Sequence, residues 1–256
     1  MIKFNLKNKV AIVTGGGSGI GKAISITLAN QGAKVHILDF NLESAQGTIL
    51  EIRKNAEAHK CDVANQKNVR EVIEKITKAE KIDILINNAG IAHIGNIEKV
   101  EEADLDRLYE VNIKGVYNCV KACINSLKNG GGVILNLASI ASSVGINDRF
   151  AYSMSKGAVL TMTYSIAKDY LKDNIRCNCI SPGRVHTSFV DGFIAKNYPG
   201  REKEMFEKLS KTQPIGRMGT TQEIADIALF LCSEEAGFIT GSNFPIDGGF
   251  VTLNGN

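Results

Sequence analysis

Short apolar runs alternate along the chain with longer stretches whose apolar residues recur at helical spacing. Two runs, Lys34–Leu38 and Lys81–Ile86, are apolar without clean alternation, as in strands that are buried on both faces. Five strands are predicted, at Val10–Thr14, Val35–Asp39, Ile82–Asn87, Val133–Leu137 and Ile175–Ile180. Five helices are predicted, at Ile20–Gln31, Leu42–Asn55, Asn65–Glu80, Glu101–Ser126 and Tyr152–Leu171.

This alternation predicts an α/β domain with a doubly wound parallel sheet and helices on both faces. Phe244–Ile246 could add a further edge strand. We find no internal repeat or linker, so residues 1–256 are expected to form a single domain. The polar stretch Ser188–Gly216 contains no predicted strand and follows the carboxyl end of one, where ligands bind in such sheets. It is interpreted as a substrate lid or, alternatively, as a surface helical insertion.

The composition is that of an ordinary folded domain. Of the 256 residues, 44% are hydrophobic, which argues against wholesale disorder. The net charge of +3 is too small to indicate a nucleic-acid partner. No apolar run approaches the roughly 18 residues of a membrane helix, and Val10–Val13 is shorter than the roughly 7–15 apolar residues of a signal peptide. We therefore expect a cytoplasmic protein that binds neither nucleic acid nor membrane.

The six cysteines and four histidines form no recognisable metal or disulfide pattern. No cysteines form a C-x-x-C pair, and the histidines lie far from one another in the sequence, at His36, His59, His93 and His186. Cys177 and Cys179 alternate with polar residues, which is the period of a strand with one buried face. We expect free, buried thiols in a reducing compartment and no metal site.

A glycine-rich segment joins the first predicted strand to the first predicted helix. Within Thr14–Gly21 the glycines follow a G-x-x-x-G-x-G spacing, at Gly15, Gly19 and Gly21. Glycines there permit a tight turn and let backbone N–H groups approach a pyrophosphate at the helix N-terminus. A purely structural turn is the alternative, and the strand–loop–helix context favours a nucleotide.

Asp39 ends the second predicted strand, 24 residues after Gly15. A carboxylate in this place accepts hydrogen bonds from the adenosine ribose and repels the 2′-phosphate of NADP. Neither Ser18 in the loop nor Phe40 after the aspartate is basic, whereas a basic residue would favour NADP. A strand-end or helix-capping carboxylate is the alternative. Together these residues predict NAD as the cofactor.

Tyr152 and Lys156 are four residues apart and share one face of a predicted helix. A phenol has a pKa near 10, and a nearby ammonium or oxidised nicotinamide favours the phenolate. The phenolate can take the proton of an alcohol while hydride leaves the carbon. Ser139, at the end of a predicted strand, would face the same cleft and orient the substrate oxygen. An amphipathic helix and a strand-end turn are the alternatives.

With these motifs in order, the chain resembles the short-chain dehydrogenase/reductase superfamily over nearly its whole length. The shared motifs are T-G-x-x-x-G-I-G at Thr14–Gly21, N-N-A-G at Asn87–Gly90, Ser139, Y-x-x-x-K at Tyr152–Lys156 and P-G at Pro182–Gly183. The resemblance implies a Rossmann fold, a homotetramer and a fourth catalytic residue, Asn112, which holds a water that relays protons to Lys156. It implies cofactor contacts from Gly15, Ser18, Gly19, Ile20, Gly21, Asp39, Asp62, Val63, Asn88, Gly90, Tyr152, Lys156, Pro182, Val185 and Thr187.

The leading hypothesis is an NAD-dependent oxidoreductase that acts on an alcohol or ketone. A 3-oxoacyl-carrier-protein reductase would share most motifs, although Asp39 argues against the NADPH that such reductases generally use. A nucleotide-binding sensor without catalysis is the alternative from another class. Such a protein would be free to lose its catalytic residues, whereas this chain contains all four, at Asn112, Ser139, Tyr152 and Lys156. A sugar-nucleotide epimerase usually has a larger C-terminal region than the one that follows Gly183.

Three potentially cationic side chains are expected to converge on the cleft, at His93, Arg149 and Arg184. The guanidinium fork matches a carboxylate. The arrangement resembles the cytosolic type of 3-hydroxybutyrate dehydrogenase, and enzymes of deoxy sugar acids such as 2-keto-3-deoxy-L-fuconate fit equally well. We predict an anionic small-molecule substrate, a hydroxy or keto acid. The alternative is that the arginines are solvated, or paired with Asp148 and Asp191.

Overall fold

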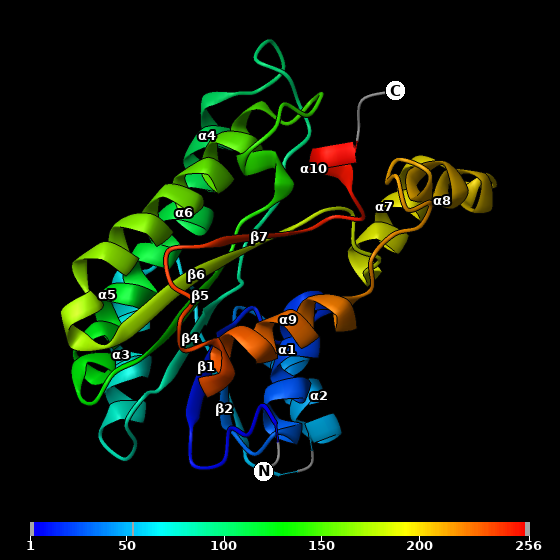
Figure 1. Cartoon of the computed structure of the whole chain (residues 1–256). Helices are drawn as coiled ribbons and strands as arrows, with labels where there is room; N and C mark the ends of the chain where they lie inside the picture. The colour runs from blue at the N-terminus through cyan, green and yellow to red at the C-terminus, as the bar shows by residue number, and fades with distance from the viewer. Residues whose placement is uncertain (1–2, 53, 254–256) are drawn as a thin grey trace.

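The apolar strands assemble into one parallel sheet (Figure 1). In this computed structural model, which describes residues 3–52 and 54–253, the sheet has seven strands in the order β3-β2-β1-β4-β5-β6-β7. They are β1 (Val10–Thr14), β2 (Lys34–Asp39), β3 (Ala56–Lys60), β4 (Ile84–Asn87), β5 (Gly132–Leu137), β6 (Ile175–Pro182) and β7 (Asn243–Ile246). The order reverses between β1 and β4, which is the place where doubly wound sheets open a crevice for ligands.

Helices cover both faces of this sheet, so the predicted α/β fold is confirmed (Figure 1). One face carries α1 (Gly19–Asn30), α2 (Leu42–Ile52) and α9 (Thr221–Cys232). The other carries α3 (Gln66–Thr77), α4 (Glu102–Leu108), α5 (Gly115–Lys128) and α6 (Phe150–Asp169). Beyond the carboxyl end of β6 lie α7 (Ser188–Asn197) and α8 (Glu202–Ser210), and α10 (Phe250–Leu253) follows β7. Among the described helices, none is long and apolar enough to cross a bilayer.

The core is built from strands that are buried on both faces. The prediction that the Ile175–Ile180 strand has one buried face is wrong, because Cys177, Asn178 and Cys179 are all fully buried. Asn178 can be buried because its amide donates to Ile239 O at 2.9 Å and accepts from Ser242 N at 3.1 Å. The six cysteines are free and buried, as predicted.

Edge strand β3 was not predicted, because Ala56–Lys60 is short and half polar. It pairs in parallel with β2, and this register places His36 opposite Glu57 and Leu38 opposite His59. His36 Nδ1 lies 3.0 Å from His59 Nε2. The distance between the two histidines in the sequence therefore did not reveal that parallel strand pairing brings their imidazoles together.

The single helix predicted over Glu101–Ser126 is interrupted. Tyr109–Lys114 forms a π-helical turn between α4 and α5. Such a turn inserts an extra residue into the helical ladder and occurs frequently at functional sites. Two predicted helices are shorter in the structure: α2 is described over Leu42–Ile52 and does not include Lys54 and Asn55, and α3 ends at Thr77. The stretch Ser188–Gly216 has no strand in the structure, as expected, and contains α7 and α8.

Candidate active site

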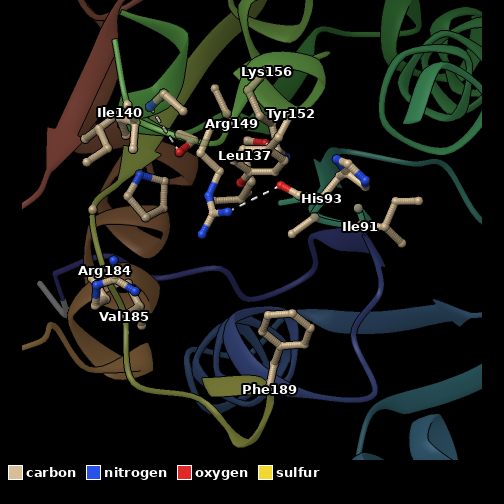
Figure 2. Close-up of a pocket in the computed structure, with 18 of the residues that line it drawn as sticks. Ile91, His93, Leu137, Ile140, Arg149, Tyr152, Lys156, Arg184, Val185 and Phe189 are labelled. Carbon is tan, nitrogen blue, oxygen red and sulfur yellow. Dashed lines mark hydrogen bonds between the residues drawn. The ribbon is translucent and has the colours of Figure 1, made fainter. Parts of the chain in front are cut away.

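A cavity of about 920 Å³ opens at the carboxyl ends of β4, β5 and β6 (Figure 2). Its wall is made by the loops after these strands, by the first turns of α6, and by residues of α4 and α7. It brings together most of the residues that the sequence indicated for substrate and nicotinamide, namely Ile20, Asn88, Gly90, His93, Ser139, Arg149, Tyr152, Lys156, Pro182, Arg184, Val185 and Thr187. Residues from five separate segments thus meet at one place.

Tyr152 and Lys156 point into this cavity from the first two turns of α6 (Figure 2). The Lys156 Nζ lies 6.0 Å from the centre of the Tyr152 ring and donates a hydrogen bond of 2.7 Å to Leu137 O at the end of β5. Burial lowers the pKa of Lys156 to about 8. Lys156 is therefore tied to strand β5, and its predicted effect on the phenol remains a prediction.

Burial in the protein favours the neutral form of the Tyr152 phenol. Burial raises its pKa above 10, and the neighbouring Ser139 hydroxyl and the Arg149 charge oppose that rise. Ser139 is 8% exposed and begins a short 3₁₀ turn, where its Oγ accepts a hydrogen bond from Ala141 N at 3.2 Å. That contact fixes the serine hydroxyl beside the phenol on the cavity wall.

Asn112 lies in the π-helical turn and is fully buried behind the cavity. Its amide accepts from Ile91 N at 2.8 Å and donates to Ile91 O and to Ser155 Oγ, both at 2.9 Å. A side chain at Gly90 would lie 3.2 Å from Asn112 Oδ1 and 3.4 Å from Lys156 Nζ, so the glycine lets the chain pass between them. Asn112 thus joins the loop after β4 to α6, and its water-relay role stays a prediction.

The glycine-rich loop after β1 has the shape that a pyrophosphate requires. Gly15 and Gly19 have φ values of +63° and +52°, which favour glycine. A Cβ on Gly21 would lie 2.2 Å from Gly15 O, so the start of α1 packs directly on the turn. Ser18 precedes α1 without capping it through its side chain. The first-turn amides of α1 therefore remain available to an anionic ligand.

Asp39 and Asn88 hold this loop from either side. Asp39 Oδ2 accepts from Gly17 N and Oδ1 accepts from Asn41 N, both at 2.9 Å. Asn88 Nδ2 donates to Thr14 O at 2.9 Å and to Gly15 O at 3.1 Å. The Asp39 carboxylate is thus fixed at the rim of the loop, and the Asn88 amide positions the turn.

The remaining predicted cofactor residues lie around the same crevice. Asp62 Oδ1 accepts from Ala64 N at 3.0 Å, and buried Val63 packs under α5, where a Cβ on Gly115 would meet it at 2.9 Å. Thr187 precedes α7 and approaches the glycine loop, since a Cβ on Gly19 would lie 3.6 Å from Thr187 Cγ2. The residues present therefore fit a dinucleotide that runs from Asp39 across the loop to the cavity.

Arg149 and Arg184 both line the cavity, Arg149 from the start of α6 and Arg184 from the loop after β6 (Figure 2). Arg149 Nη1 donates to His93 O at 3.4 Å and to Asp148 O at 3.2 Å, and Arg184 Nε donates to Thr212 Oγ1 at 3.3 Å. Burial lowers the pKa of Arg184, and the charge of Arg149 adds to this effect. Neither guanidinium has a carboxylate within 4.0 Å in residues 3–52 and 54–253.

Neither of the carboxylates expected to compete for these arginines pairs with them among the described residues. Asp148 offers Arg149 only its backbone carbonyl, and Asp191 lies 2.7 Å from His186 Nε2. His93 lines the cavity, and its Nε2 lies 3.2 Å from Asp104 Oδ2. His93 is therefore already partnered, whereas Arg149 and Arg184 have no carboxylate partner among the described residues.

Several residues of the cavity wall carried no signal in the sequence. Asp104 and Arg107 enter it from α4, and Gln213 reaches it from the segment after α8. Gln213 is buried, and its Oε1 accepts from Arg184 N at 3.3 Å. These positions depend on long-range packing of α4 and of the 188–216 stretch, which local periodicity does not encode.

Comparison with known proteins assigns the family. Residues 15–251 match the family model described as enoyl-(acyl carrier protein) reductase. An uncharacterized oxidoreductase of Thermotoga maritima is 40% identical over 97% of this chain and 100% of its own length. Dehydrogenase/reductase SDR family member 6 of Aquarana catesbeiana is 39% identical over 96% of this chain and 98% of its own.

Among solved structures, L-sorbose reductase of Gluconobacter frateurii, complexed with NADPH and L-sorbose, is similar with a TM-score of 0.92. It is 28% identical, and the match covers 98% of this chain and 99% of that one. With the glycine loop, the Tyr152–Lys156 pair and the cavity in place, these relatives show that the chain belongs to the short-chain dehydrogenase/reductase superfamily and is an oxidoreductase acting on an alcohol or ketone group.

Proposed function

We propose that the protein transfers hydride between NAD and a small hydroxy or keto acid, of which deoxy sugar acids are one class. The observation that carries this proposal is the pair Arg149 and Arg184, which face the cavity of Tyr152 without a carboxylate partner among the described residues. Hydride transfer itself needs neither guanidinium. Two half-buried positive charges on the wall of one cavity favour a substrate that carries a negative charge.

Asp39 supports NAD rather than NADP. Its carboxylate is fixed at the glycine loop by Gly17 N and Asn41 N, at the end of β2 where an adenosine ribose would lie. A 2′-phosphate in that place would meet a negative charge, and the adjacent Phe40 is exposed and offers no positive one. The similar L-sorbose reductase was solved with NADPH, so cofactor choice is a point on which this chain is proposed to differ.

The catalytic groups are proposed to divide the work as follows. A nicotinamide bound in this crevice would supply the chemistry of hydride transfer to or from the substrate carbon. In oxidation the Tyr152 phenol first releases its own proton to the path through Lys156 and Asn112, and the phenolate then takes the hydroxyl proton of the alcohol. In reduction the phenol donates its proton to the carbonyl oxygen and regains one along the same path. Ser139 orients the reacting oxygen, and Lys156 is positioned by Leu137 O to hold the cofactor ribose. Asn112 is proposed to hold a water that relays protons to and from Lys156.

Replacing Arg149 by methionine is expected to raise KM for the acid by about tenfold or more, the loss of one charge-assisted hydrogen bond. Because the Arg149 charge lowers the pKa of Tyr152, its removal should also move the acidic limb of the oxidation pH profile, below which too little phenolate is present, to higher pH. Steady-state kinetics across pH measures both effects. Arg149→Lys is the matched control, since it keeps the charge and should leave the pH limb near that of the wild type. An unchanged KM in Arg149→Met, or better turnover of neutral alcohols, would show that the pocket does not select anions.

A reductase of acyl-carrier substrates is the second candidate, because the matching family model carries that description. The charged cavity wall disfavours a long acyl chain, since Arg149, Arg184 and His93 would be covered by apolar groups. A preference for NADPH and for acyl thioesters would establish this candidate. The non-catalytic sensor has no such support, because the relatives named by activity are enzymes.

We also propose a homotetramer, which rests on the family resemblance. Aromatic side chains of α5 and α6 are solvent-exposed in the single chain, at Tyr117, Phe150 and Tyr164. Exposed apolar groups on neighbouring helices are typical of a surface that another subunit covers. Light scattering should give about four times the 27.6 kDa of one chain, and a monomeric mass would remove this proposal.

A further inference from the structure

A cluster of imidazole and carboxylate groups lies at the β2–β3 edge of the sheet, outside the active-site cavity. His36 on β2 and Glu57 and His59 on β3 offer ligand atoms that all lie within 4.8 Å of one another. Parallel register puts their side chains on one face of the sheet, because His36 pairs with Glu57 and residues two apart share a face. This is the face covered by α3 and α5.

The two imidazoles are spaced as two ligands of one ion would be. His36 Nδ1 lies 3.0 Å from His59 Nε2, and two nitrogens bound tetrahedrally to zinc at about 2.0–2.1 Å are about 3.3 Å apart. Glu57 is exposed, so solvent can reach the third ligand position.

The opposite nitrogen of His36 gives an independent indication. His36 is 1% exposed, and its Nε2 has no hydrogen-bond partner among the residues that the structure describes. The nearest acceptor is Glu80 Oε1, at 3.6 Å. A metal-bound histidine usually donates its other N–H to a carboxylate, which fixes the ring and raises its basicity. Metal binding at Nδ1 would leave the proton on Nε2, facing Glu80.

We propose that His36, Glu57 and His59 bind a divalent transition-metal ion such as zinc, with Glu80 orienting His36 and a water completing the coordination. Imidazole ligands select zinc, copper or nickel over magnesium and calcium, which prefer oxygen. The Lys34 ammonium lies beside this cluster and contacts both Glu57 and Glu80. A bound ion would compete with that ammonium for the carboxylates and would tie edge strand β3 to β2.

The test is zinc binding by the tag-free full-length protein, measured by equilibrium dialysis and by thermal unfolding. We expect one zinc ion per chain at micromolar free zinc, and a melting temperature raised by about 5–10 °C at a hundredfold excess over Kd. His59→Gln should weaken binding at least about tenfold while it leaves oxidoreductase activity unchanged. His186→Gln is the matched control, because it removes a histidine that pairs with a carboxylate outside the cluster.

Two further variants separate a metal site from a structural contact. Glu80→Gln should weaken zinc binding about 10–100-fold, as loss of an orienting carboxylate does. Lys34→Met should tighten it about tenfold, because the competing ammonium is gone, and a variant that only damaged the fold would not bind more tightly. Absence of binding at micromolar zinc, binding that His59→Gln leaves unchanged, or no tightening in Lys34→Met would overturn the proposal.

Discussion

Tyr152→Phe is expected to abolish measurable turnover, a loss of at least about 10²–10⁴ in kcat, while leaving cofactor affinity within a factor of about two. The phenol hydroxyl is proposed to be the group that exchanges a proton with the substrate oxygen, and phenylalanine keeps the ring and removes only that oxygen. Tyr152 lines the cavity beside Ser139, so the substitution leaves the packing of α6 in place. Initial rates and fluorescence titration with NADH measure the two quantities.

Tyr164→Phe is the matched control for this variant. Tyr164 lies on the same helix, is 43% exposed and is not part of the cavity wall. It should retain wild-type kcat. If Tyr152→Phe turned over substrate at a rate near that of the wild type, the assignment of the proton donor would be wrong.

The second large effect concerns the cofactor. The wild-type kcat/KM is expected to favour NAD over NADP by about 100-fold, and Asp39→Ser should reduce this ratio about 10–100-fold. The Asp39 carboxylate would repel the 2′-phosphate of NADP and could donate no hydrogen bond to it. Serine removes that negative charge and can still accept a hydrogen bond from Gly17 N. Kinetics with both cofactors gives the ratio directly.

Glu43→Ser is the control, because it removes an exposed carboxylate from the first turn of α2 without touching the glycine loop. It should leave the cofactor ratio unchanged. A wild-type preference for NADPH would contradict the role proposed for Asp39 and would favour the acyl-carrier candidate.

Much of the fold could be predicted from local patterns because its central strands are apolar and bounded by glycines and helices. The five strands expected at the centre of the sheet are present, and Phe244–Ile246 lies within β7. Edge strand β3 was not predicted because a strand at the edge of a sheet needs fewer apolar residues, and its Glu57 and His59 resemble loop residues. The interruption at Tyr109–Lys114 was not predicted because a π-helical turn keeps nearly the same apolar spacing as the helices on either side of it.

The candidate site was predictable where function depends on short motifs and unpredictable where it depends on packing. Tyr152 and Lys156 meet in the cavity because four residues make about one helical turn. Arg149 and Arg184 also reach it, but whether nearby carboxylates neutralised them could be known only from the structure. The contact between His36 and His59 depends on the register of a strand that the sequence did not reveal.

The most direct test of the central claim is a spectrophotometric assay of the purified enzyme with NAD over a panel of small hydroxy acids, deoxy sugar acids and neutral polyols. The proposed function predicts NADH formation with one or more of the acids, at a kcat/KM at least about tenfold above that for any neutral polyol, and no signal from Tyr152→Phe. Faster oxidation of neutral polyols than of every acid, or turnover with NADP alone, would contradict it.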